Sequence, residues 1–342
     1  MPKVYLKKID SYSKTKEISS SAAELLEKVA QENGIKFRGE IPIKVHFGER
    51  GNATFIGAEN FKALAEQVKK SGAIPFFTDT NVLYKGERIK EETHIALAKK
   101  HNFDYLPIKI ADGKTGDDFK EVEINKKHFK KCRIGKKIAD ANQMIVLAHF
   151  KGHMLAGFGG ALKQLGMGCA SRAGKLAMHS NSKPALNPLK CKKCKLCVQS
   201  CPSDAIIIDI IPRIDSNKCT GCAKCIAVCP NGAMNINWLS ILPNTFTEKL
   251  AEYAYAAQKD KEVIYINFVL NITKDCDCMG HKMKPIYKDL GVLASTDAVA
   301  LDKACFDLLS EQEGKKVFGG EHVFDYAEEN GLGKKEYTLI KI

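Results

Sequence analysis

The chain of 342 residues lacks any run of about 18 consecutive apolar residues, which excludes a membrane-spanning helix. Its first residues contain no apolar run of about 7 to 15 residues, so no secretory signal is visible. The low hydrophobicity of disordered chains is absent too, because 44% of the residues are hydrophobic. We therefore expect a cytoplasmic protein with a packed core. Its length suits about two domains of roughly 150 residues each.

Acidic residues are fewer than basic ones. The sequence has 53 Lys and Arg against 40 Asp and Glu, a formal net charge of +13. This excess fits a lysine-rich solvated surface, or alternatively an acidic protein, a nucleic acid or an anionic small molecule as partner. Basic residues interleaved with aromatic ones, as in nucleic-acid recognition motifs, are missing. We therefore expect no nucleic-acid partner.

Cysteine is abundant, with 13 residues. The odd count and the missing secretory signal argue against a disulfide framework. Eight cysteines form two runs with the spacing C-x2-C-x2-C-x3-C-P, and each cysteine of the second run follows its counterpart by 28 residues. This regularity indicates an internal duplication. The first run is Cys191, Cys194, Cys197 and Cys201, and the second is Cys219, Cys222, Cys225 and Cys229.

The spacing of the two runs predicts two 4Fe–4S clusters. Three cysteines that are two residues apart surround one face of a cubane, and the fourth, which precedes proline, reaches the cluster of the other run. Zinc sites use cysteines in pairs, so this spacing disfavours zinc. Residues 188–237 resemble bacterial two-cluster ferredoxins. The predicted ligands are Cys191, Cys194, Cys197 and Cys229 for one cluster, and Cys219, Cys222, Cys225 and Cys201 for the other.

The sequence on both sides of the cysteine runs alternates strand and helix patterns. This alternation predicts an α/β fold, a mostly parallel sheet with flanking helices. We expect one discontinuous α/β domain, residues 1–187 and 238–342, with a small α+β ferredoxin-like domain inserted at 188–237. Capping-box patterns predict helices that begin at Ser21 and Thr245. The predicted strands are residues 4–9, 41–47, 73–78, 106–110, 144–149, 263–272 and 291–294, and further helices are predicted at 58–70 and 298–309.

A glycine-rich segment with several cations follows the strand at 144–149. Glycine-rich backbone that leaves a strand cradles anions in many proteins, and the alternative is a flexible loop with surface lysines. The segment is not a Walker A loop, because it lacks the G-x-x-x-x-G-K-[ST] spacing. We predict a loop that holds an anionic ligand, with Lys163 and Lys175 as the cations that bind it.

A second polar segment, residues 275–281, follows the apolar strand at 263–272. Loops at the carboxyl ends of parallel strands are where α/β proteins bind ligands. Cys276, Cys278 and His281 are candidate ligands of an additional, unidentified soft metal. The two cysteines also suit thiol redox chemistry, and a polar turn with incidental thiols is the third alternative.

Polar residues end other predicted strands as well. Right-handed βαβ connections bring such strand ends to one edge of a parallel sheet. We therefore predict a ligand site there, distinct from the clusters, with His153, Cys276 and Cys278 as catalytic candidates. The ligand-binding candidates are Lys44, His46, Asp79, Asn81, Lys151, Lys163 and Lys175.

Long phrases of the chain are similar to those of one family of uncharacterised iron–sulfur proteins, catalogued as domain of unknown function 362. They lie at residues 43–52, 79–81, 151–163, 275–278 and 293–297. One departure is the alanine at Ala298, where related proteins usually have proline. The resemblance spans nearly the whole chain and implies the α/β arrangement with its ferredoxin insert. It implies no reaction.

These features favour an anaerobic iron–sulfur redox protein that passes electrons from two clusters to a ligand or metal in the α/β domain. It would be an oxidoreductase of unknown substrate, with a redox protein as partner. One alternative is a plain ferredoxin-type electron carrier whose α/β part is a docking module. The other is a non-redox binding protein in which the clusters are structural.

Overall fold

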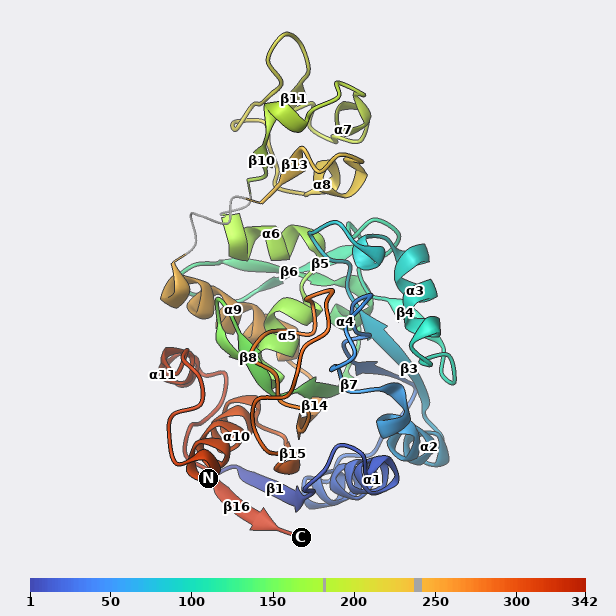
Figure 1. The fold of residues 1–342 in the computed structure, drawn as a ribbon, viewed down its shortest axis with the longest axis vertical. Coiled ribbons are helices and arrows are strands. Elements are labelled where there is room, and N and C mark those ends of the chain that lie inside the picture. The colour runs from blue at the N-terminus through green and yellow to red at the C-terminus, as the bar shows by residue number, and fades with distance from the viewer. Residues whose placement is uncertain (181–182, 237–241) are drawn as a thin grey trace.

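The computed structural model describes residues 1–180, 183–236 and 242–342. Its centre is an eight-stranded sheet in the order β16-β1-β15-β14-β7-β2-β3-β4 (Figure 1). The strands of this sheet are β1 (Lys3–Lys8), β2 (Glu40–Lys44), β3 (Ile74–Asp79), β4 (Ile108–Ile110), β7 (Gln143–His149), β14 (Glu262–Val269), β15 (Gly291–Ser295) and β16 (Thr338–Lys341).

Most neighbouring strands of the sheet run parallel. The exception is β15, which pairs antiparallel with both β1 and β14. The remaining pairings, from β14 through β7, β2 and β3 to β4 and between β1 and β16, are parallel. Residues 270–290 contain no helix, so the chain returns from β14 without the crossover that a parallel strand needs. The predicted α/β fold with a mostly parallel sheet is confirmed.

Helices cover both faces of the sheet. Side chains alternate along a strand, so Ile145 and Leu147 of β7 pack toward α1 and α2, whereas Met144 and Val146 pack toward α5 and α9. The first layer holds α1 (Thr15–Glu32), η1 (Ala58–Phe61), α2 (Lys62–Lys70), η2 (Glu87–Ile89) and α3 (Glu91–Lys100). The second holds α4 (Lys136–Ala139), α5 (Ala161–Cys169), α6 (Arg172–Ser180), α9 (Pro243–Gln258), α10 (Ala298–Glu313) and α11 (His322–Glu329).

Two predicted helix starts are wrong. Helix α1 begins at Thr15, six residues before Ser21, and Ser21 is buried inside it. Ile18 packs in the core with the later turns, which extends the helix toward the N-terminus. Helix α9 begins at Pro243 rather than Thr245, because proline suits the first helical turn. Both segments match the capping-box pattern in sequence. The observed starts differ because core packing extends α1 and because Pro243 begins α9.

The glycine-rich segment is not a loop. It forms the hairpin of β8 (Lys151–His153) and β9 (Gly157–Gly159), followed by α5 and α6. A Cβ on Gly160 would lie 2.3 Å from an oxygen of Asp302, and a Cβ on Gly166 would lie 2.3 Å from the carbonyl of Leu250 on α9. These glycines therefore permit close packing of α5.

The N-terminus of α5 already faces an anion. The backbone N–H groups of Ala161 and Leu162 donate hydrogen bonds to the two carboxylate oxygens of Asp302, at 2.7 and 2.9 Å. A buried carboxylate thus occupies the position at which a helix would hold a ligand phosphate. The predicted anion cradle in the backbone is absent at this helix end.

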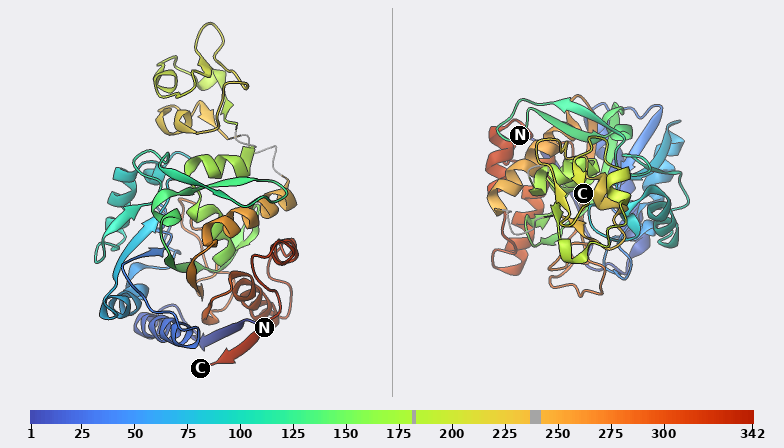
Figure 2. Two further views of the ribbon diagram at one scale, coloured as in Figure 1. Left: turned by 180° about the vertical axis from the view of Figure 1, so that it is seen from behind. Right: turned by 90° about the horizontal axis from the view of Figure 1, so that it is seen from above.

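The cysteine-rich segment forms small elements of its own, which project beyond α6 at one end of the molecule (Figures 1 and 2). The predicted boundary at residue 188 falls just after β10, and Asn237 lies outside the described residues. The division into two domains therefore stays a prediction. The elements are two antiparallel pairs, β10 (Ala185–Leu186) with β13 (Met234–Asn235) and β11 (Ile206–Ile207) with β12 (Arg213–Ile214), together with η3 (Pro188–Lys190), α7 (Leu196–Gln199) and α8 (Lys224–Val228).

Among the three described stretches of the chain, no helix combines the length and the apolar character that crossing a membrane requires. The hairpin of β5 (Phe119–Glu123) and β6 (Lys131–Gly135) completes the fold and lies beside α6 (Figure 1).

Candidate functional site

Two small cavities divide the eight cysteines of the runs into two sets of four. Each set takes three cysteines from one run and the last cysteine of the other run. We call the first the distal set and the second the proximal set. The distal set is Cys191, Cys194, Cys197 and Cys229, and the proximal set is Cys201, Cys219, Cys222 and Cys225.

Backbone groups of both runs turn toward the cysteine sulfurs. The N–H of Ala205 donates to Cys201 Sγ at 3.3 Å, and the N–H of Ala233 donates to Cys229 Sγ at 3.2 Å, again 28 residues apart. Lys193 has a φ of 53°, in the left-handed region, and its counterpart Gly221 has a φ of 70°. The two runs therefore repeat one loop conformation, which is compatible with two 4Fe–4S clusters.

The proximal set lies against the α/β unit. Lys224 of α8 forms an ion pair with Asp117 at 2.7 Å, and Arg133 donates to the carbonyl of Thr220 at 3.2 Å. Leu83 and Leu176 of the α/β unit belong to the same apolar cluster as Cys225 and Ile226. In Figure 1, α8 accordingly lies between the sheet and α7.

A cavity of about 630 Å³ lies at the carboxyl ends of β2, β3 and β14. This volume is typical of small-molecule sites. We call it the strand-end cavity. Its polar lining is His46, Asp79, Thr80, Tyr84, Arg88, His153, Lys163, Gln164, Lys175, His179, Asp275, Cys276 and Cys278. Its apolar lining is Val82, Leu83, Met154, Leu155, Met167, Phe246 and Met279.

Two thiols and an ammonium group meet at one corner of the strand-end cavity. Lys163 Nζ lies 3.3 Å from Cys276 Sγ. A hydrogen bond from Cys278 and the nearby Lys163 hold the pKa of Cys276 well below its ordinary value, although burial opposes them. The same hydrogen bond and burial raise the pKa of Cys278. The corner therefore favours one thiolate, at Cys276, beside one thiol.

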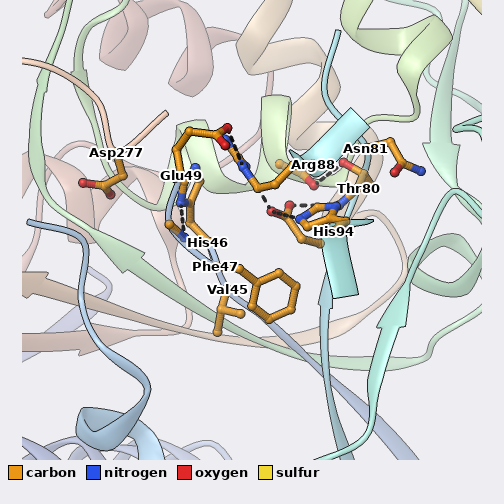
Figure 3. Close-up of polar contacts among 12 residues, drawn as sticks. Val45, His46, Phe47, Glu49, Thr80, Asn81, Arg88, His94 and Asp277 are labelled. Carbon is orange, nitrogen blue, oxygen red and sulfur yellow. Dashed lines mark hydrogen bonds and ion pairs between the residues drawn. The ribbon is translucent and has the colours of Figure 1, made fainter. Parts of the chain in front are cut away.

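Asp277, between the two cysteines, anchors the turn. Its buried carboxylate contacts His149 Nδ1 at 3.0 Å and Lys151 Nζ at 3.1 Å. Asn52 donates to the carbonyls of Asp277 and Met279, at 3.4 and 3.2 Å. Burial alone would raise the pKa of Asp277, but His149 and Lys151 lower it. In Figure 3, Asp277 lies apart from the groups around Arg88.

Arg88 lines the cavity wall as well, between Glu49 and His94 (Figure 3). Its Nε lies 3.1 Å from Glu49 and its Nη1 lies 3.5 Å from Asp79. Asp79 also contacts Lys44 Nζ at 2.9 Å beneath the cavity. Although burial acts to raise the pKa of Asp79, Lys44, His94 and Arg88 hold it well below its ordinary value. This wall is a network of buried, paired charges.

Histidines that line the cavity are neutral at physiological pH. Burial and Arg88 lower the pKa of His46, while burial and Lys163 lower the pKa of His153 to about 3. His153 Nδ1 accepts hydrogen bonds from the N–H groups of Leu155 and Ala156, at 3.2 and 3.0 Å. A ring nitrogen that accepts such bonds carries no proton, so the geometry agrees with the direction of the shift.

The structure brings most of the predicted ligand residues together. Lys44, Asn81 and Lys151 are buried but are not part of the lining, and Asn81 donates to Asp112 Oδ1 at 2.9 Å instead. His281 is exposed and also lies outside the lining. The predicted residues that line the strand-end cavity are His46, Asp79, His153, Lys163, Lys175, Cys276 and Cys278.

The metal site predicted at Cys276, Cys278 and His281 stays a prediction. Within residues 1–180, 183–236 and 242–342, no three His, Cys, Asp or Glu residues form a group that could hold a metal ion. This finding covers the eight cysteines of the two runs as well. It does not count against clusters there, because a cubane separates its ligands more widely than a single metal ion does.

Sequence reasoning missed Tyr84 and Arg88. Both lie in the connection after β3, several residues beyond the strand end at Asp79. The signal that could have found them is the length of that connection, since polar residues in long loops after parallel strands often reach the site.

Comparison with known proteins gives a family and a few distant structures. No curated protein matches the chain. A crystal structure of a protein from Thermotoga maritima is 12% identical, with a TM-score of 0.44, over 89% of this chain and 60% of that one. The lactate racemase apoprotein from Thermoanaerobacterium thermosaccharolyticum is 14% identical, with a TM-score of 0.45, over 91% of this chain and 58% of that one. The chain thus spans less than two thirds of either protein. Residues 41–307 match the family model described as Domain of unknown function (DUF362), so the chain belongs to this family.

Proposed function

We propose that the protein binds two 4Fe–4S clusters and passes electrons from them to a ligand in the strand-end cavity. One observation carries the proposal. The eight cysteines separate into two sets of four, each with three cysteines of one run and one of the other, and the proximal set lies against the unit that holds the cavity. This is the arrangement that two-cluster ferredoxins require.

The cysteine sets fit cubanes in their surroundings as well. Backbone N–H groups at Ala205 and Ala233 point at sulfurs, and such hydrogen bonds stabilise cluster thiolates. Left-handed backbone at Lys195 and Ala223 lets each loop fold around its cavity. A bound cubane supplies one-electron chemistry.

Leu83 connects the two parts of the proposed path. It lines the strand-end cavity and packs in the apolar cluster that contains Cys225. Electrons that reach the proximal set would therefore pass to the cavity through this apolar contact. A plain electron carrier has no need of such a cavity, and this favours the redox enzyme over that alternative.

The ligand in this proposal is a small molecule with an apolar body and an anionic group. Lys163 and Lys175 supply positive charge on one side of the cavity, and Met167 and Phe246 are among the apolar side chains. Arg88 pairs with the carboxylates of Glu49 and Asp79. Among the described residues no carboxylate pairs with Lys163 or Lys175, although Lys163 lies beside Cys276, so these are the cations that we assign to the ligand.

The partner in this proposal is an acidic one-electron donor protein that docks on the distal set. Cys194 is exposed there, among the exposed lysines Lys190, Lys192, Lys193 and Lys195. The surface also exposes apolar side chains, with Leu189 94% and Ile210 88% exposed. Lys193 Nζ donates to the carbonyl of Ile210 at 3.2 Å, so the basic and apolar parts adjoin. Basic charge with an apolar centre suits an acidic protein.

The test is the cofactor content of protein purified without oxygen. We expect close to eight irons and eight acid-labile sulfides per chain, and two reducible centres by electron paramagnetic resonance. Four irons per chain after full reconstitution, or a colourless zinc-loaded protein, would contradict the proposal.

A further inference from the structure

We propose that Cys276 and Cys278 are a redox-active pair, which closes to a disulfide and is reopened by two electrons. This inference rests on the proposed function only for the source of the electrons. It assigns to the strand-end cavity a thiol reaction in place of a metal.

The turn at residues 275–280 brings the two thiols to the same place. The N–H of Met279 donates to the carbonyl of Cys276 at 2.9 Å, which closes the turn. The carboxylate of Asp277, the residue between the two cysteines, contacts His149 and Lys151 instead of lining the cavity. Cys276 and Cys278 both line the cavity, and Lys163 Nζ lies 3.3 Å from Cys276 Sγ.

A disulfide is compatible with this spacing. Residues two apart have Cα atoms at most about 7 Å apart in extended chain, and closer in a turn. A disulfide bridges Cα atoms that are about 4.4 to 6.8 Å apart. Closure therefore needs a rotation of the side chains rather than a rearrangement of the fold.

Lys163 makes Cys276 the reactive sulfur. Its ammonium lies 3.3 Å from Cys276 Sγ, and a cation at this distance stabilises the thiolate, which is the nucleophile of thiol chemistry. The same ammonium disfavours a metal, because it would repel a cation bound to the two sulfurs. Nor do the described residues place a third ligand beside them, since His281 is exposed.

The reaction balances with one-electron donors. Opening the disulfide breaks one S–S bond and consumes two electrons and one proton, and it leaves the Cys276 thiolate beside the Cys278 thiol. Two clusters that each give one electron supply this need, and the acidic donor protein refills them. The proton comes from water in the cavity. In the closing direction, the two sulfurs return the same two electrons to the oxidised clusters, and the proton of Cys278 is released to water.

The test follows the thiols directly. Anaerobic holoprotein is oxidised with the small disulfide cystamine, desalted, alkylated and digested with trypsin. We expect the peptide of residues 275–282 to be unalkylated and lighter by two hydrogen atoms. After stoichiometric reduction with dithionite, the same peptide should carry two alkyl groups. Alkylation of both thiols before reduction, or a metal that stays bound to them, would overturn the inference.

The uptake of electrons gives a second readout. The cystamine-treated wild type should accept about four electrons per chain, two for the clusters and two for the disulfide. The double variant Cys276→Ser with Cys278→Ser should accept about two, with iron and sulfide unchanged, because it keeps no thiol at this site that cystamine could convert to a disulfide. Cys305→Ser, which alters a buried thiol of α10, is the matched control and should accept four. Two electrons in wild type with full iron content would overturn this inference alone, whereas low iron content would count against the proposed function.

Discussion

Lys44 and Asp79 form a buried ion pair that joins β2 to β3 beneath the cavity, with 0% and 5% of their side chains exposed. Removing one partner leaves the other charge without its main counterion. We expect Lys44→Met to lower the free energy of unfolding of the holoprotein by about 3 to 5 kcal/mol. The control is Lys3→Met, which removes an exposed pair with Glu32 and should cost less than about 1 kcal/mol. Denaturant titration measures both, and equal effects would contradict this account of the wall.

The low pKa of His153 predicts that the free energy of unfolding depends on pH. Its folded pKa is about 3, against 6.5 in the unfolded chain. As the pH falls through 6.5, only the unfolded state takes up the proton, so acid favours unfolding. Between about pH 7.5 and 5.5 this one group should remove about 1.4 kcal/mol of stability. His153→Asn keeps a hydrogen-bond acceptor but cannot be protonated. The variant should therefore lose less stability over this range, and an unchanged slope would contradict the assignment.

At the same scale, the sequence predicted some site residues and not others. His46 lies two residues after the end of β2, and the Cys276–Cys278 pattern marked the loop that follows β14, so the topology of a parallel sheet sufficed to bring them together. Arg88 lies nine residues after Asp79, and only the path of the connection brings it back to the cavity. No local sequence pattern predicts the path of this connection.

Among the elements, α5 shows where local patterns fail. Its glycines predicted a loop that cradles an anion. In the structure Gly166 instead admits the backbone of α9, and Asp302 fills the helix end. Glycine marks a close approach of backbone, but the sequence does not say whether a ligand or another helix approaches. Seven of the eight strands of the central sheet were predicted because each is a short apolar run between turns, as β7 and β15 show, whereas the edge strand β16 was missed.

Replacing the last cysteine of either run should perturb the cluster held mainly by the other run. Because Cys201 lines the cavity of the proximal set, Cys201→Ser should perturb the cluster held by the second run. Cys229→Ser should perturb the cluster held by the first run. Electron paramagnetic resonance of the two reduced variants should show complementary changes, with one signal preserved in each. If both variants lose the same signal, or each loses the cluster of its own run, the crossed assignment is wrong.

At the scale of the whole molecule, the cysteine-rich segment carries a basic outer surface at the distal set, and its proximal set lies on the side of the strand-end cavity. We expect electrons to enter at the distal set and to leave at the proximal set. Lys192→Glu with Lys195→Glu should slow reduction by a small acidic flavoprotein about tenfold at low salt. The difference should shrink as ionic strength rises, since salt screens exposed charges.

Stopped-flow measurement of the second-order rate constant checks this prediction. The matched control is Lys16→Glu with Lys36→Glu, which reverses two exposed lysines in and just after α1. Helix α1 lies at the end of the molecule remote from the cysteine-rich segment (Figure 1). It should leave the rate within about twofold of wild type. Equal slowing by both pairs would mean that net charge, rather than the distal surface, guides the donor.

At this scale, the strand–helix alternation sufficed to predict an α/β fold, and the resemblance of phrases such as residues 43–52 and 151–163 predicted membership of the family. The single reversed strand, β15, was not predicted, because strand direction depends on the connection and leaves no mark in the strand itself. The contact of Leu83 with the cysteine-rich segment was equally out of reach, since it depends on how this segment packs against a distant part of the chain.

The most direct test of the account is an anaerobic crystal structure of the holoprotein with anomalous diffraction at the iron edge. We expect two peaks per chain, one enclosed by Cys191, Cys194, Cys197 and Cys229, and one enclosed by Cys201, Cys219, Cys222 and Cys225. The second peak should be the nearer one to Leu83 and the strand-end cavity. A single iron centre, a zinc edge in place of iron, or clusters held by the four cysteines of one run would contradict the account.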